Sequence, residues 1–120
     1  MSVTSDLIRG NTDTIILSCL ESEDSYGYRI NKTVMSVTGG EYEFKEATLY
    51  SAFKRLEESG CIVSYWGGEM LGARRRYYKI TEQGRRVLDS LRKDWEASKQ
   101  IIDKLTKRES ESWKTKSDNI

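Results

Sequence analysis

The segment that decides the fold reads Lys45-Glu46-Ala47-Thr48-Leu49-Tyr50-Ser51-Ala52-Phe53-Lys54-Arg55-Leu56-Glu57-Glu58-Ser59-Gly60. At about 100° per residue, its apolar side chains cluster within roughly 60° of Leu49 on a helical wheel. Gly60 stands where a helix commonly ends on a left-handed residue. The pattern predicts an amphipathic helix over residues 45–60, whose core-facing side chains are Leu49, Ala52, Phe53 and Leu56.

The opposite face of this predicted helix is polar and not strongly acidic at its leading end. Small and hydroxyl-bearing side chains occupy its N-terminal half, where they can approach base edges in a DNA groove. Basic side chains follow one turn later, where they suit phosphates. An ordinary solvated helix face has the same composition, so this face alone leaves both interpretations open. The residues concerned are Ala47, Thr48, Tyr50, Ser51, Lys54 and Arg55.

Two helices are predicted before this segment. Apolar spacing indicates the first over residues 6–20, and a weaker second stripe on it suggests contacts with both its own core and a partner. Ser25 is placed to cap the second helix. Its apolar side chains recur over residues 26–37, until Gly39-Gly40 ends it.

The segment is followed by a predicted hairpin and a long helix. Residues 62–66 and 77–80 are β-branched and aromatic, as strands are, and the glycine-bearing loop between them is long enough to project. Thr81 is placed to cap the last helix, which is expected to reach about Arg108. The tail over residues 109–120 is mostly Ser, Lys, Glu and Asp and is expected to be frayed.

This order of elements predicts a mainly α fold with a small β-hairpin. It is the layout of a winged helix-turn-helix over residues 1–80, with a long C-terminal dimerisation helix over residues 81–108. In such a motif the later helix enters the DNA major groove, which is about 12 Å wide. The sequence therefore predicts a DNA-binding protein.

The composition argues against catalysis and metal binding. The chain has no histidine, the commonest general base and zinc ligand. It carries no glycine-rich phosphate loop. Cys19 and Cys61 are too far apart for a metal or redox motif and are expected to be buried and reduced, with a thiol sensor as the alternative. We expect no enzyme activity, no metal and no cofactor.

Charge is segregated along the chain although the net charge is only +1. Acidic residues dominate the first 24 residues, whereas residues 45–79 are basic. Such segregation builds a local positive field, which favours nucleic-acid binding. No apolar run approaches the roughly 18 residues that span a bilayer, and the first residues do not resemble a signal peptide, so a cytoplasmic location is expected.

Six short motifs occur along the chain: Ser25-Tyr26-Gly27-Tyr28-Arg29-Ile30, Glu46-Ala47-Thr48-Leu49-Tyr50, Lys54-Arg55-Leu56-Glu57, Ser64-Tyr65-Trp66-Gly67, Arg74-Arg75-Arg76-Tyr77-Tyr78 and Thr81-Glu82-Gln83-Gly84. Together these motifs resemble the PadR family of bacterial transcriptional regulators. The resemblance extends from about residue 7 to residue 105, and it is closest to short members with a single C-terminal helix, including multidrug-sensing repressors.

The resemblance implies a homodimer that binds a two-fold symmetric DNA operator and represses transcription until a small molecule or a stress signal relieves it. It implies DNA contacts by the outer face of residues 45–60, by the wing, and by tyrosines of the second helix. Tyr28 is the better candidate of the two tyrosines because Tyr26 also fits the apolar stripe. The wing residues expected to contact DNA are Gly72, Arg74, Arg75 and Arg76.

The last helix has apolar side chains that are expected to pack against a second copy of the chain. The dimer interface is predicted to contain Ile8, Leu88, Leu91, Trp95, Ile102 and Leu105. The alternative is a pocket in which the Trp95 ring stacks on a planar hydrophobic molecule. The resemblance to multidrug-sensing relatives implies such a pocket, lined here by Leu7, Gly10, Thr14, Val87, Leu91, Trp95 and Lys99.

A rival interpretation is a winged-helix module that binds proteins and has no role on DNA. Under that interpretation, replacing Arg74 and Arg75 by alanine would leave a gel shift unchanged. The second alternative is an enzyme, and turnover of a substrate in the absence of DNA would support it.

Overall fold

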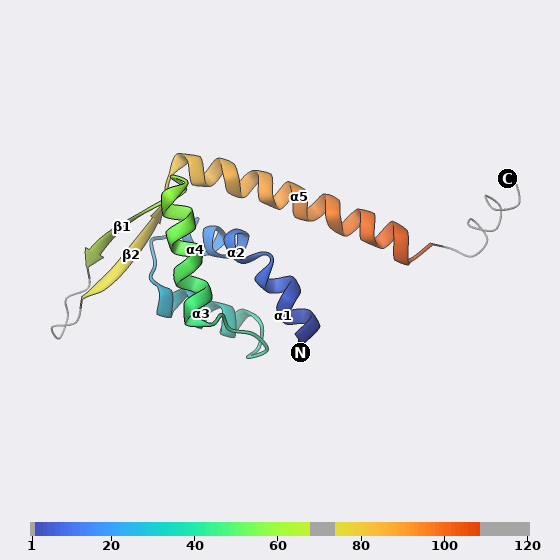
Figure 1. Ribbon diagram of the computed structural model, residues 1–120, viewed down its shortest axis with the longest axis horizontal. Helices are drawn as coiled ribbons and strands as arrows, with labels where there is room; N and C mark the ends of the chain where they lie inside the picture. The colour runs from blue at the N-terminus through green and yellow to red at the C-terminus, as the bar shows by residue number, and fades with distance from the viewer. Residues whose placement is uncertain (1, 68–73, 109–120) are drawn as a thin grey trace, which may run out of the picture. The chain divides into compact units, whose positions relative to one another are not determined.

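The computed structural model describes residues 2–67 and 74–108, and its elements follow the predicted order except that two helices replace the first predicted one (Figure 1). It is mostly helical, with a two-stranded antiparallel hairpin and a long C-terminal helix, as the sequence predicted. The elements are α1 (Ser2–Arg9), α2 (Thr12–Leu20), α3 (Gly27–Val37), α4 (Glu46–Glu58), β1 (Ile62–Gly67), β2 (Arg75–Ile80) and α5 (Glu82–Thr106).

The chain divides into two compact units between Asp89 and Ser90, within α5. The first unit therefore extends past the predicted boundary at residue 80 and includes the first two turns of α5. Leu88 belongs to this unit and is only 1% exposed. Its assignment to a dimer interface was wrong, because its side chain is already buried in the core of its own chain.

The single helix predicted over residues 6–20 was also wrong, because the chain breaks at Gly10 and Asn11. The side-chain amide of Asn11 donates to the Leu7 carbonyl (2.9 Å), and the Thr12 hydroxyl donates to the Arg9 carbonyl (2.6 Å). Polar side chains that satisfy backbone carbonyls compete with the helical hydrogen bonds, and glycine adds conformational freedom. The spacing of apolar residues does not predict this break in the helix.

Ser25 does not cap α3, contrary to the prediction. Its backbone pairs with Tyr78 of β2 through two hydrogen bonds of 2.8 and 3.2 Å, and its hydroxyl accepts from Arg29 Nε (3.0 Å). The residue directly before α3 is Tyr26, which is extended and makes no side-chain capping bond. Ser25 thus forms an isolated antiparallel β-bridge with Tyr78 at the edge of the hairpin.

The core lies between α2, α3, α4 and the hairpin. The predicted apolar face of α4 is confirmed, since Leu49, Ala52, Phe53 and Leu56 are all buried. The Phe53 ring stacks on Tyr78 of β2, with centroids 4.0 Å apart and planes 17° from parallel. In the hairpin Ile62 pairs with Ile80 and Trp66 pairs with Arg76.

The turn between α3 and α4 is held by the side chain of Asn31. Its amide nitrogen donates to the Phe44 carbonyl and its amide oxygen accepts from the Phe44 backbone N–H, both at 2.8 Å. The Phe44 ring is buried. Gly39 and Gly40, with φ values of 63° and 84°, end α3 as predicted because such angles strain other residues.

The start of α5 lies against the end of α4. Thr81 caps α5 as predicted, since the Gly84 N–H donates to its hydroxyl (3.0 Å). At Gly84 the two backbones approach so closely that a Cβ atom would lie 2.1 Å from the Cys61 carbonyl oxygen and 2.8 Å from Ile80 Cγ1. Only glycine fits at this position.

Gly84→Ala should therefore destabilise the protein, although Gly to Ala normally stabilises a helix by about 1 kcal/mol. The clash with the Cys61 backbone forces the helix to shift, and overpacking of this kind costs about 1–3 kcal/mol. Urea denaturation monitored by circular dichroism measures the change. The matched control is Arg86→Ala, an exposed position on the same helix, with an expected change below about 0.5 kcal/mol. A more stable Gly84→Ala variant would contradict the packing described.

Candidate nucleic-acid interface

The outer face of α4 carries the predicted polar side chains. Ala47, Ser51 and Lys54 are exposed, and Thr48 is partly exposed near the start of the helix. Tyr50 is half exposed and packs edge-on against Phe53, with centroids 5.8 Å apart. Because the apolar side of α4 is buried, these side chains are free to meet a partner.

Arg55 differs from the other residues of this face because it is already engaged. Its Nη2 atom lies 2.5 Å from Oδ1 of Asp13 on α2. The hydrogen bond to Asp13 raises the pKa of Arg55, so the charge is retained. Asp13 accepts from Nε and Nη2 of Arg55, so the remaining N–H groups of this half-exposed side chain can still reach a phosphate, whereas no ion pair is described for Lys54.

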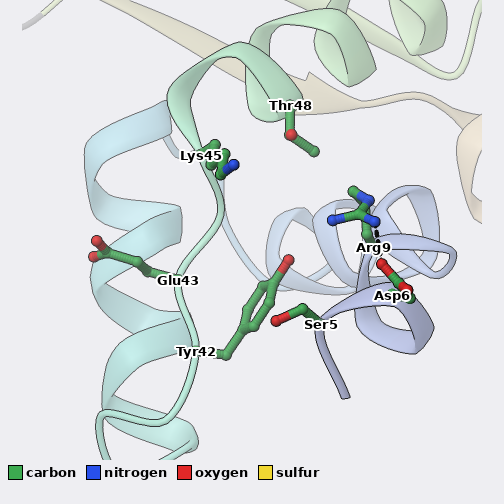
Figure 2. Close-up of a pocket in the computed structure, with 7 residues that line it drawn as sticks. All are labelled: Ser5, Asp6, Arg9, Tyr42, Glu43, Lys45 and Thr48. Atoms are coloured by element: carbon green, nitrogen blue, oxygen red, sulfur yellow. Dashed lines mark hydrogen bonds and ion pairs between the residues drawn. The ribbon is translucent and has the colours of Figure 1, made fainter. Parts of the chain in front are cut away.

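Sequence reasoning missed a polar pocket of about 240 Å³ at the leading end of α4. Figure 2 shows Tyr42, Lys45 and Thr48 from the α3–α4 side facing Arg9 of α1, whose guanidinium pairs with Asp6. Tertiary packing brings these residues together from distant parts of the chain, and no local motif marks them. The pocket is lined by Ser5, Asp6, Arg9, Tyr42, Glu43, Lys45 and Thr48.

The tyrosines of the α3 region have different environments. Tyr28 is 68% exposed, and Lys32 Nζ lies 5.5 Å from its ring centroid. Tyr26 is half-buried and packs edge-on against Tyr77 of β2 at 5.2 Å. The preference for Tyr28 as a candidate contact agrees with these exposures.

The three arginines of the hairpin make cation–π contacts with aromatic rings. The guanidinium carbons of Arg74 and Arg76 lie 5.3 and 5.7 Å from the Trp66 ring centroid. The guanidinium carbon of Arg75 lies 4.8 Å from the Tyr26 ring. Contacts of this kind at exposed sites are each worth about 0.5–1 kcal/mol. Gly72, the remaining predicted wing contact, lies outside the described residues.

The residues predicted for a ligand pocket fall on both compact units. Leu7, Gly10, Thr14 and Val87 belong to the first unit, and Leu91, Trp95 and Lys99 belong to the second. Within the second unit, Lys99 Nζ lies 5.9 Å from the Trp95 ring and pairs with Glu96 at 3.0 Å. The pocket stays a prediction.

The remaining predicted dimer contacts are accessible to different degrees. Ile8 and Leu91 are half-buried, Trp95 is partly exposed, and Ile102 and Leu105 are more than half exposed.

The Cys19 thiol is partly buried, and burial raises its pKa, which keeps it protonated and unreactive at neutral pH. None of the described helices is long and apolar enough to cross a membrane.

The sequence matches one family model and one relative over most of its length. The model of the transcriptional regulator PadR-like family matches residues 16–90. An uncharacterized protein of Lysinibacillus sphaericus is 44% identical over 101 residues, which cover 84% of this chain and 93% of that protein.

Solved structures match over most of their length. A transcriptional regulator from Clostridium thermocellum is 49% identical, with a TM-score of 0.78 over 85% of this chain and 96% of that one. A PadR family transcription regulator from Clostridium difficile is 35% identical, with a TM-score of 0.67 over 79% and 97%. A PadR family transcriptional regulator from Eggerthella lenta is 30% identical, with a TM-score of 0.78 over 90% and 92%.

Proposed function

The chain belongs to the PadR-like family of transcriptional regulators, and from this premise we propose that it is a homodimeric repressor of a two-fold symmetric DNA operator. A small molecule or a stress signal relieves the repression. The family consists of DNA-binding regulators and not of enzymes, which also disfavours a protein-interaction module without a role on DNA.

One observation carries the proposal. The apolar side of α4 is fully buried while its outer side presents Ala47, Ser51 and Lys54 to solvent. A helix in the major groove needs small and hydrogen-bonding side chains at its leading end and cations where the DNA backbone rises beside it. In a symmetric dimer two copies of α4 would lie about one DNA turn, ~34 Å, apart.

Purified protein should bind a mixed-sequence duplex at low ionic strength and protect a footprint in the promoter of its own gene. Lys54→Ala should weaken binding to all duplexes and reduce the slope of log affinity against log salt by about 0.9, because one phosphate contact is lost. Lys104→Ala, at the end of α5, is the charge-matched control and should leave the slope unchanged. Protein that ignores every duplex at low salt would refute the proposal.

Dimerisation is proposed for the C-terminal part of α5. Ile101, Ile102 and Leu105 are 56%, 54% and 60% exposed in the single chain. A helix with such an apolar stripe commonly buries it against a symmetry mate.

Ile102→Asp should therefore convert the dimer to a monomer, because a carboxylate would be buried in the interface. Sedimentation equilibrium measures the mass. Gln100→Asp introduces the same charge about 160° away from Ile102 around the helix axis and should leave the dimer intact. If both variants sediment like the wild type, the interface lies elsewhere.

The effector is proposed to be a planar hydrophobic molecule that contacts Thr14, one of the residues predicted for the ligand pocket. Thr14 adjoins Asp13, whose carboxylate pairs with Arg55 of α4. A ligand that moves α2 would therefore disturb the DNA-facing helix through this ion pair. Any affinity for DNA that is lost on ligand binding must equal the affinity for ligand that is lost on DNA binding.

In a thermal-shift screen of planar cationic compounds, at least one compound should raise Tm and also weaken DNA binding. Asp13→Asn should keep the Tm shift but lose most of the antagonism, since the link to α4 is cut. Glu23→Gln makes the same charge change at an exposed site and should behave like the wild type. A panel in which no compound shifts Tm or quenches tryptophan fluorescence would remove the support for an effector of this class.

A further inference from the structure

The three consecutive arginines of the wing divide between the two faces of the hairpin. Side chains alternate along a strand, so Arg74 and Arg76 lie on one face and Arg75 lies on the other. The register agrees, because Arg76 is paired with Trp66. Arg74 and Arg76 approach the Trp66 ring, whereas Arg75 approaches Tyr26.

The Arg75 face connects the wing to the start of α3. Tyr26, under the Arg75 guanidinium, is also approached by Arg29 at 5.0 Å. It packs on Tyr77, which stacks on Tyr65 with centroids 5.6 Å apart. The Tyr65 hydroxyl donates to Asp24 Oδ2 (2.5 Å), just before α3. Arg75 is thus one member of a cluster that fastens the hairpin to the helical part of the unit.

The Arg74 and Arg76 face is the one that packs against α4. Further along this face Tyr78 is buried and stacks on Phe53 of α4. Arg76 Nη2 lies 3.6 Å from Oε2 of Glu57 on α4, and this carboxylate also accepts a 2.5 Å hydrogen bond from Ser64. Trp66 is 53% exposed, so a large ring lies at the surface beside two cations.

We propose that Trp66 is a positioning residue that holds Arg74 and Arg76 ready for DNA phosphates beside α4, whereas Arg75 is a structural clasp that touches no phosphate. A guanidinium stacked on a ring keeps its N–H donors, which lie in its plane, available for phosphate oxygens. Fewer rotamers are then lost on binding. This proposal rests on the proposed DNA binding.

Salt titrations on a mixed-sequence duplex separate the three arginines. Arg74→Ala and Arg76→Ala should each reduce the slope of log affinity against log salt by about 0.9. Arg75→Ala should leave the slope at the wild-type value but lower Tm, because it weakens the clasp on Tyr26. If Arg75→Ala reduces the slope as much as the other two variants, the division of roles is wrong.

Substitution of Trp66 tests the positioning role. Trp66→Leu should lower duplex affinity by up to about tenfold, because losing two exposed cation–π contacts lowers the population of arginines already held for binding, while both arginines keep the slope unchanged. Trp66→Tyr, which restores an aromatic face, should recover most of that affinity. Equal affinities for Trp66→Leu and the wild type, or no recovery in Trp66→Tyr, would overturn the assignment.

Nuclear magnetic resonance of the arginine Nε–H groups tests the stack without DNA. The Arg74 and Arg76 signals should be displaced by the ring current of Trp66 in the wild type and should lose that displacement in Trp66→Leu. Signals that are the same in both proteins would refute the stack even if the wild type binds DNA. A wild type that shows displaced signals but binds no duplex would refute the proposed function and the phosphate role together, leaving only the geometry.

Discussion

The close backbone contact between Gly84 and Cys61 is the constraint on which the arrangement of the first unit depends. Around it, the Thr81 N–H donates to the Cys61 carbonyl (3.0 Å), and the Thr81 hydroxyl donates to the Gly60 carbonyl (2.6 Å). Gln83 Nε2 donates to the Ser59 carbonyl (2.8 Å). The turn between α4 and β1 is therefore joined to the start of α5 by one set of hydrogen bonds.

The aromatic stack of Phe53 on Tyr78 extends this junction along the inner face of α4. Because Phe53 fills the core, the opposite side of the helix has to face outward. Tyr78 in turn aligns β2, whose next residues toward the loop are Tyr77 and Arg76. The orientation of the polar face and the placement of the wing arginines thus have a common origin in one buried pair of rings.

The sequence was informative where a feature depends on periodicity or on one residue's backbone preference. The stripe of Leu49, Ala52, Phe53 and Leu56, the stop at Gly39 and Gly40, and the cap at Thr81 are all of this kind. The sequence was not informative where a side chain forms hydrogen bonds with groups that only the folded chain brings near it. Asn11 and Ser25 form hydrogen bonds that a linear pattern does not encode.

Contacts between residues far apart in the sequence could not be predicted for the same reason. Arg55 and Asp13 are 42 residues apart in sequence, and nothing in either neighbourhood marks the pair. The sequence showed that Leu88 is apolar, but it did not show whether Leu88 is buried in the core or in a dimer interface. The same apolar spacing along a helix is found in both cases. The aromatic partners of Arg74, Arg75 and Arg76 depend on the strand register, which the long loop between the predicted strands left open.

The Asn31 clamp on Phe44 has a consequence for how the protein responds to its medium. Both hydrogen bonds join uncharged groups, and neither partner gains or loses a proton near neutrality. Dissolved electrolyte screens charges but leaves such amide pairs nearly untouched. Ionic conditions therefore leave this link between α3 and α4 nearly unchanged, whereas added salt weakens the Asp13–Arg55 ion pair that joins α2 to α4.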